Sequence, residues 1–143
     1  MWWNLLNHPE TLEAVLDDDS LWTNAFSETM RRTPAVISEE RFTTKPVELH
    51  GFEIPKGARM RACLASAHLD PTVFNDPLTF DIFRPDLHLG KENRSGVSKD
   101  AGRSGHFGFW LGKHFCIGYE LARNEAIIGS QMIIERLGMP SLQ

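Results

Sequence analysis

Apolar positions near the start of the chain recur every three or four residues, the spacing of a helix that buries one face. A first helix is predicted from Pro9, which suits an initial turn, with its apolar positions at Leu12, Val15 and Leu16. A second is predicted between Ser20, a residue suited to the N-cap, and Thr33, with apolar positions at every fourth residue, namely Trp22, Phe26 and Met30. Pro34 ends it, because a residue before proline avoids helical geometry.

From residue 35 to residue 64 the chain carries short apolar runs between turn residues, which is typical of β-strands. Val47 and Leu49 precede the turn pair His50-Gly51, and the chain continues after it with Phe52 and Ile54. The tripeptide Pro55-Lys56-Gly57 then turns into a run from Met60 to Leu64. The pattern predicts a small antiparallel sheet.

The last third of the chain combines loops with one long helix. Residues 70–107 hold several prolines and few periodic apolar positions, and loops of that length are usually functional or mobile. After Cys116 a helix is predicted that ends near Gly138 and Pro140, with apolar positions at Leu121, Ile128 and Met132. All these elements together predict a mixed α+β fold, mainly α, in one unit of residues 1–143.

Composition excludes several classes of protein. The chain of 143 residues is 41% hydrophobic and 24% charged, which is ordinary for a folded soluble domain. Its formal charge of −4, without a basic stripe, argues against a nucleic-acid partner. The two cysteines, Cys63 and Cys116, are too few for a disulfide framework and favour a reducing, cytoplasmic setting.

The apolar start of the chain is too short for a membrane span and lacks the features of a signal peptide. It resembles the end of an element whose packing partners lie further upstream. We therefore expect its large apolar side chains to be exposed, namely Trp2, Trp3, Leu5 and Leu6.

The residues best suited to chemistry surround Cys116. A cysteine near a helix N-terminus is favoured as a thiolate, the form that binds metal ions. Gly112 and Gly118 let the backbone approach a flat bound group closely, and Phe109 can cover the sulfur. An isolated cysteine is more often a small buried hydrophobe, and a zinc site with His114 and Cys63 lacks paired ligand spacing.

The segment Phe109-Trp110-Leu111-Gly112-Lys113-His114-Phe115-Cys116-Ile117-Gly118 resembles the heme-binding loop of cytochrome P450. The family has Phe seven positions before the cysteine, Gly four before and two after it, and His or Arg two before it. The resemblance implies that Cys116 is the axial ligand of heme iron and that His114 donates to a heme propionate. Trp110 departs from the pattern, because the family usually has Gly there.

Other landmarks occur in the order that the family shows. Glu28 and Arg31 resemble its Glu-x-x-Arg helix, and Arg84 resembles the arginine that completes an ion cluster with them. Taken alone, Glu28 and Arg31 would be a solvated pair of little consequence. Arg41 matches a strand arginine that pairs with a propionate in many bacterial members, although an ordinary surface arginine is the alternative.

One further run, Ala67-His68-Leu69-Asp70-Pro71, resembles the family's Ala-Asn-Arg-Asp-Pro segment, with Leu69 standing where Arg is common. The resemblance extends over almost the whole chain but matches only the last part of a family member. It implies the C-terminal portion of the cytochrome P450 fold, without the distal helix and the substrate-recognition segments.

By this resemblance the parent activity is a monooxygenase that inserts one oxygen atom from dioxygen into a small organic substrate. The implied cofactor is heme b, and the implied partner is a ferredoxin or a similar electron-transfer protein. The alternatives are a non-catalytic fragment that acts as a heme-binding or interaction module, and a thiol-redox protein, which the lack of Cys-x-x-Cys disfavours. We expect the 143-residue chain by itself not to catalyse monooxygenation.

Overall fold

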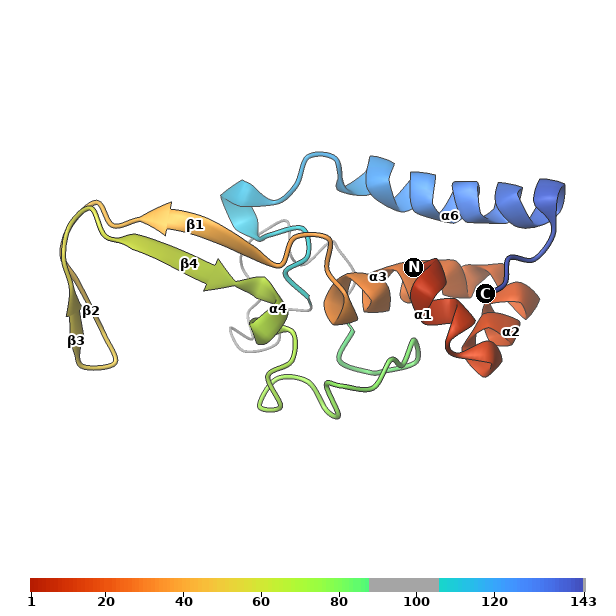
Figure 1. Cartoon of the computed structure of the whole chain (residues 1–143), viewed down its shortest axis with the longest axis horizontal. Coiled ribbons are helices and arrows are strands. Elements are labelled where there is room, and N and C mark those ends of the chain that lie inside the picture. The colour runs from red at the N-terminus through yellow and green to blue at the C-terminus, as the bar shows by residue number, and fades with distance from the viewer. Residues whose placement is uncertain (88–105, 143) are drawn as a thin grey trace.

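The computed structural model describes residues 1–87 and 106–142. Figure 1 shows helices gathered at one end of the molecule, strands at the other, and the segment that leads into the last helix between them. The described helices, with two 3-10 turns, are α1 (Trp2–Leu6), α2 (Pro9–Asp17), η1 (Asp19–Leu21), α3 (Trp22–Arg32), α4 (Leu64–Ala67), η2 (Gly112–His114) and α6 (Tyr119–Leu137). This is the predicted class, a mixed α and β fold that is mainly helical.

The core lies where α1, α2 and α3 meet the stretch around Phe80. Its buried members are Leu5, Val15, Trp22, Ala25, Phe80 and Ile82, and Ile127 and Ile134 of α6 pack against it. The expectation that the apolar start is exposed was therefore wrong for most of its residues. Leu5 is fully buried, and Trp2 packs edge-on against Trp22 with ring centroids 6.2 Å apart. Its neighbour Trp3 is largely exposed, at 68%.

The start of α3 differs from the prediction, whereas its end agrees. Ser20 lies inside η1 and caps nothing; instead Asp18 Oδ1 accepts its N–H at 2.9 Å. Hydrogen bonding from the Ser20 side chain, together with this backbone bond, lowers the pKa of Asp18. A 3-10 turn thus separates α2 from α3. The helix α3 begins at Trp22 and ends at Arg32, with Thr33 as its C-cap.

The strands form two separate antiparallel pairs rather than the single sheet that was predicted. β1 (Ser38–Phe42) pairs with β4 (Arg59–Cys63), and β2 (Val47–Leu49) pairs with β3 (Phe52–Ile54). Pro46 and Pro55 stand between the two pairs and have no N–H to donate, so one ladder cannot run through.

The turn between β2 and β3 has the geometry that favours a tight hairpin. His50 has φ 51° and Gly51 has φ 80°, and positive φ at both central residues matches the right-handed twist of the flanking strands. The predicted turn at His50-Gly51 is therefore confirmed. The β2–β3 hairpin lies at the end of the molecule that is far from the helices (Figure 1).

The helix α6 runs from the middle of the molecule to the helical end, alongside α3 (Figure 1). Its predicted end is confirmed, since Gly138 is the C-cap with φ 80°. Its predicted apolar positions do not face the core, because Leu121, Ile128 and Met132 are exposed while Ile127 and Ile134 pack inward. None of the helices within the described residues has the length and apolar character needed to cross a membrane.

Candidate functional site

The segment before α6 presents the thiol of Cys116 at the surface. The Cys116 N–H donates to the carbonyl of Phe109 at 2.9 Å, and its own carbonyl accepts the N–H of Tyr119, the first residue of α6, at 3.3 Å. The next residue, Ile117, is fully exposed. The backbone therefore holds Cys116 just ahead of the helix, with its thiol and an apolar neighbour facing outward.

The two predicted glycines of this segment differ in what the chain requires of them. Gly112 has φ 52°, a left-handed backbone conformation that residues with a Cβ rarely adopt. Gly118 has φ −85°, and a Cβ there would come no closer than 3.8 Å to its nearest neighbour, the Cys116 sulfur. The chain's own atoms therefore leave room for a side chain at Gly118, and its absence fits the close approach of a bound flat group.

Trp110 also adopts a left-handed conformation, with φ 63°. This value explains why glycine suits the position, since a left-handed residue with a Cβ is strained by about 1–2 kcal/mol. The indole is half-buried and faces Arg41 of β1, whose guanidinium carbon lies 4.6 Å from the ring centroid. The cation–π contact brings Arg41 to the Cys116 segment and offsets part of the strain.

Aromatic side chains seat the segment on the helices. The ring of Phe109 lies 5.8 Å from that of Phe26 in α3 and 5.0 Å from that of Tyr119 in α6, centroid to centroid. The Phe109 ring thus packs inward against the helices, and Phe109 contacts Cys116 through its carbonyl oxygen, which accepts the Cys116 N–H. Gly108 comes so close to α3 that a Cβ there would lie 3.2 Å from the Met30 carbonyl oxygen. Sequence reasoning assigned no role to Gly108.

Glu28, Arg31 and Arg84 form a buried ion cluster beside this seat. Arg31 reaches both carboxylate oxygens of Glu28 at 2.7 Å, and Arg84 Nε lies 3.2 Å from the same carboxylate. Asp86 accepts from Arg84 Nη1 at 2.8 Å. Burial by itself would lower the pKa of Arg84, but the Asp86 hydrogen bond and the charge of Glu28 outweigh it and raise that pKa.

Arg31 and Arg84 also donate hydrogen bonds to the backbone of a stretch of irregular chain. Arg31 donates to three carbonyl oxygens at 2.8–3.0 Å, those of His68, Pro77 and Thr79. Arg84 donates to the carbonyls of Asn75, Asp76 and Thr79 at 3.1–3.3 Å. The cluster therefore orders residues 68–86, which contain no regular strand or helix of their own.

Two histidines that no prediction used as site residues lie between the cluster and the Cys116 segment. His68, the C-cap of α4, and His106 are both buried, with ring centroids 6.1 Å apart. Burial lowers the pKa of His68 to about 4. Burial lowers that of His106 to about 3, helped by the positive charge that His68 carries when protonated and by the charge of Arg31. Both rings are uncharged at neutral pH.

The two candidates for carboxylate binding lie at the surface. Arg41 is half-exposed, and its Nη1 donates to the Glu40 carbonyl at 2.7 Å and lies 3.5 Å from a Glu39 carboxylate oxygen. His114 is exposed in η2. Cys63 is also exposed, at the end of β4. Across residues 1–87 and 106–142, no three His, Cys, Asp or Glu side chains gather as a metal site.

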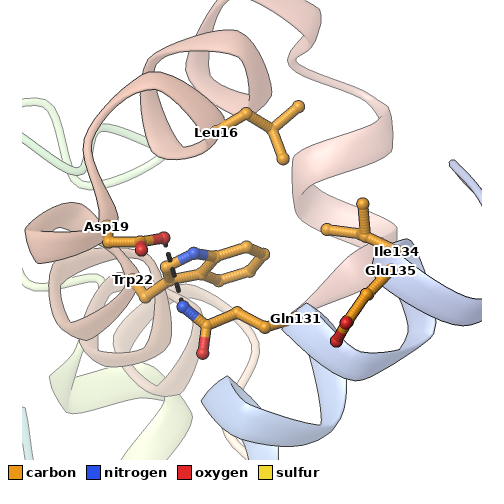
Figure 2. A pocket seen from close by; sticks show the side chains of 6 residues that line it. All are labelled: Leu16, Asp19, Trp22, Gln131, Ile134 and Glu135. Carbon is orange, nitrogen blue, oxygen red and sulfur yellow. Dashed lines mark hydrogen bonds between the residues drawn. The ribbon is translucent and has the colours of Figure 1, made fainter.

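A hollow of about 300 Å³ lies at the other end of α6. Figure 2 shows its walls, with Gln131 Nε2 donating to Asp19 Oδ1 at 3.1 Å; the lining residues are Leu16, Asp19, Trp22, Gln131, Ile134 and Glu135. About 18 Å of helix, at 1.5 Å per residue, separates Gln131 from Tyr119. The hollow is therefore no part of the Cys116 site.

Comparison with known proteins identifies the family to which the chain belongs. The sequence profile described as "Cytochrome P450" matches residues 16–139. The chain is 38% identical to cytochrome P450 monooxygenase PikC of Streptomyces venezuelae over 133 residues, which cover 92% of this chain and 28% of PikC. It is 33% identical to pulcherriminic acid synthase of Bacillus subtilis, covering 96% of this chain and 32% of that protein.

Among solved structures, the chain is similar to CYP109E1 from Bacillus megaterium, determined in complex with corticosterone, and to cytochrome P450 TbtJ1. The TbtJ1 match has a TM-score of 0.76 and 32% identity, and it covers 94% of this chain and 31% of that one. The CYP109E1 match has a TM-score of 0.80 and 26% identity, and it covers 99% of this chain and 34% of that one. The chain belongs to the cytochrome P450 family. It spans about a third or less of the length of these relatives.

Proposed function

We propose that residues 1–143 supply the thiolate side of the heme site of a heme-thiolate monooxygenase, with Cys116 as the axial ligand of the iron. The observation that carries the proposal is the outward-facing thiol of Cys116, held by main-chain bonds in a segment where Gly118 keeps the surface flat. A relative that covers most of this chain, PikC, is named a monooxygenase.

The exposed groups around the thiol suit a flat, mostly apolar molecule that carries carboxylates. Ile117 offers an apolar contact beside the sulfur. Arg41 and His114 offer N–H donors for the carboxylates, and guanidinium geometry matches a carboxylate well. These groups fit heme b. When bound, such a heme would supply the activation of dioxygen for insertion of one oxygen atom into a small organic substrate.

The part of each residue in this proposal follows from its position. Cys116 provides the anionic sulfur, and Phe109 and Gly112 shape the turn that presents it. The cluster of Glu28, Arg31 and Arg84 keeps that turn in place. Electrons would come from a ferredoxin or a similar partner. Both cysteines are free and exposed, which fits a reducing compartment such as the cytoplasm.

The experiment compares Cys116→Ala with Cys63→Ala after heme reconstitution of the chain. Both thiols are exposed, so Cys63 is a matched control for loss of a surface thiol. The reduced carbon-monoxide complex should show the thiolate band of the family in the wild type and in Cys63→Ala, and should lose it in Cys116→Ala. Equal spectra of the two variants would refute the assignment.

A second candidate is a heme-binding or interaction module without catalytic activity. The observation in its favour is that the chain spans about a third or less of its relatives, so residues 1–143 carry less than a whole cytochrome P450. The two candidates differ in product formation by the heme-loaded chain with a reductase pair and a panel of small apolar substrates. Coupled hydroxylation by this chain would exclude the second candidate.

A further inference from the structure

His68 is bonded on two sides to parts of the site that lie far apart in the sequence. Its carbonyl oxygen accepts from Arg31 Nη1 at 3.0 Å, which joins it to the ion cluster. Its ring Nε2 accepts the N–H of Phe107 at 2.6 Å, which joins it to the segment that leads to Cys116. His68 is fully buried, so neither bond competes with water.

The ring of His68 is fixed by its neighbours as well as by this bond. It stacks on the Phe107 ring, with centroids 5.9 Å apart and planes at 26°, and it meets the His106 ring edge-on. The segment that begins here continues through Gly108, which touches α3, to Phe109, whose carbonyl holds the Cys116 N–H. A shift of Phe107 would therefore move the turn that presents Cys116.

The chemistry of the bond requires an uncharged acceptor. Because Nε2 accepts, the ring proton of His68 resides on Nδ1, and Nδ1 is buried without a partner among the described residues. The positively charged neighbour Arg31 and the burial of the ring both oppose protonation. An asparagine side chain could accept the same N–H through its carbonyl oxygen, whereas a leucine of similar bulk could not.

We propose that His68 is a positioning residue, which sets the place of the Cys116 segment by coupling the Phe107 N–H to the Glu28–Arg31–Arg84 cluster. The inference rests on the proposed function in so far as Cys116 is the iron ligand. The hydrogen bond from Phe107 to His68 is a property of the chain without cofactor, so it is tested first in that chain.

The first test needs no substitution. In the ¹⁵N-labelled wild-type chain, a bond from the Phe107 N–H to His68 Nε2 should give a scalar coupling between these two nitrogens, and the His68 ring should be the Nδ1-H tautomer. A folded chain that lacks this coupling would overturn the proposal.

The second test compares three variants by hydrogen exchange. In His68→Leu the Phe107 amide loses its acceptor and should exchange about fivefold faster or more, since an intramolecular hydrogen bond contributes modestly to stability. His68→Asn should restore slow exchange. His50→Asn, the same change in the distant β2–β3 turn, is the matched control and should leave Phe107 unchanged. An unchanged exchange rate of the Phe107 amide in a folded His68→Leu variant would contradict the proposal. If that variant does not fold, the scalar coupling measured in the wild-type chain decides whether the proposal stands.

The third test reads the consequence for Cys116. After heme reconstitution, His68→Leu should show a smaller fraction of the thiolate band, and His68→Asn should recover it. An undiminished band in His68→Leu would overturn the positioning role. Failure of the proposed function looks different, because Cys116→Ala would then leave the heme spectrum unchanged while the coupling between His68 and Phe107 remained intact.

Discussion

Replacing Glu28 by Gln should destabilise the chain far more than the same change at Glu120, although the two ion pairs look alike locally. Each glutamate lies three residues before its arginine on a helix, with a shortest nitrogen–oxygen distance of 2.7 Å. Their burial differs. The side chains of Glu28 and Arg31 are inaccessible, whereas those of Glu120 and Arg123 are 50% and 29% exposed.

The expected size of the effect follows from what the substitution leaves behind. Glu28→Gln removes the negative charge shared by Arg31 and Arg84, and breaking a buried ion pair typically costs about 3–5 kcal/mol. Arg31 keeps its three carbonyl acceptors, so we expect the lower end of this range. Glu120→Gln should cost about 0–1 kcal/mol, because water solvates the remaining arginine.

Urea unfolding, followed by tryptophan fluorescence and far-UV circular dichroism, measures both free energies. With an m value of about 2 kcal/mol per molar urea, Glu28→Gln should lower the midpoint by about 1.5 M and Glu120→Gln by less than about 0.5 M. Similar midpoints for the two variants would refute the reasoning that burial decides the strength of these pairs.

Other substitutions and a change of pH test the seat of the Cys116 segment. Gly108→Ala should destabilise the folded chain by about 1–3 kcal/mol, since the new Cβ would lie 3.2 Å from Met30 of α3. Gly129→Ala, in the open middle of α6, should stabilise it by about 0.5–1 kcal/mol, and thermal melts should therefore shift in opposite directions. Trp110→Gly should be more stable than Trp110→Ala by about 1 kcal/mol, because φ 63° strains only the alanine; equal melting temperatures would argue against that strain. The pKa values of His68 and His106, about 4 and about 3, lie below the ordinary 6.5, so below pH 6.5 the unfolded chain binds more protons than the folded chain. The free energy of unfolding should therefore fall as the pH drops from about 6.5 to about 4, by up to about 1.4 kcal/mol per pH unit for each ring. Urea midpoints that stay flat over this range would contradict the burial of both rings in the neutral form.

The helices and the turn of the hairpin could be predicted because their signals are local. Pro9 opens α2, and the four-residue spacing from Trp22 describes α3, since one face of each helix meets the core. The burial of Leu5 could not be predicted in this way. Its neighbours in the core include Phe80 and Ile82, which lie far along the chain and leave no periodic trace near residue 5.

The candidate site divides in a similar manner. The spacing around Cys116 identifies the segment, because Gly112 must adopt a left-handed backbone and the helix must start soon after the cysteine. The connection through His68 has no such signal, since any buried acceptor could bond the Phe107 N–H and residue type alone does not show where the ring points. The face of α6 was also mispredicted at Ile128, because isoleucines stand next to each other on two sides of that helix.

The order of the site residues along the chain has a consequence for how the protein is made. Glu28, Arg31, His68 and Arg84 all precede Cys116, so the ribosome delivers the ion cluster and His68 before the thiol, whereas Tyr119 of the aromatic seat follows it. At roughly 5–20 residues per second, Cys116 is synthesised about 2–6 s after Arg84, an interval in which local helices and ion pairs have ample time to close. The ion cluster can therefore close while Cys116 is still unmade, and the packing of Ile127 and Ile134 of α6 against the core is the step that comes last.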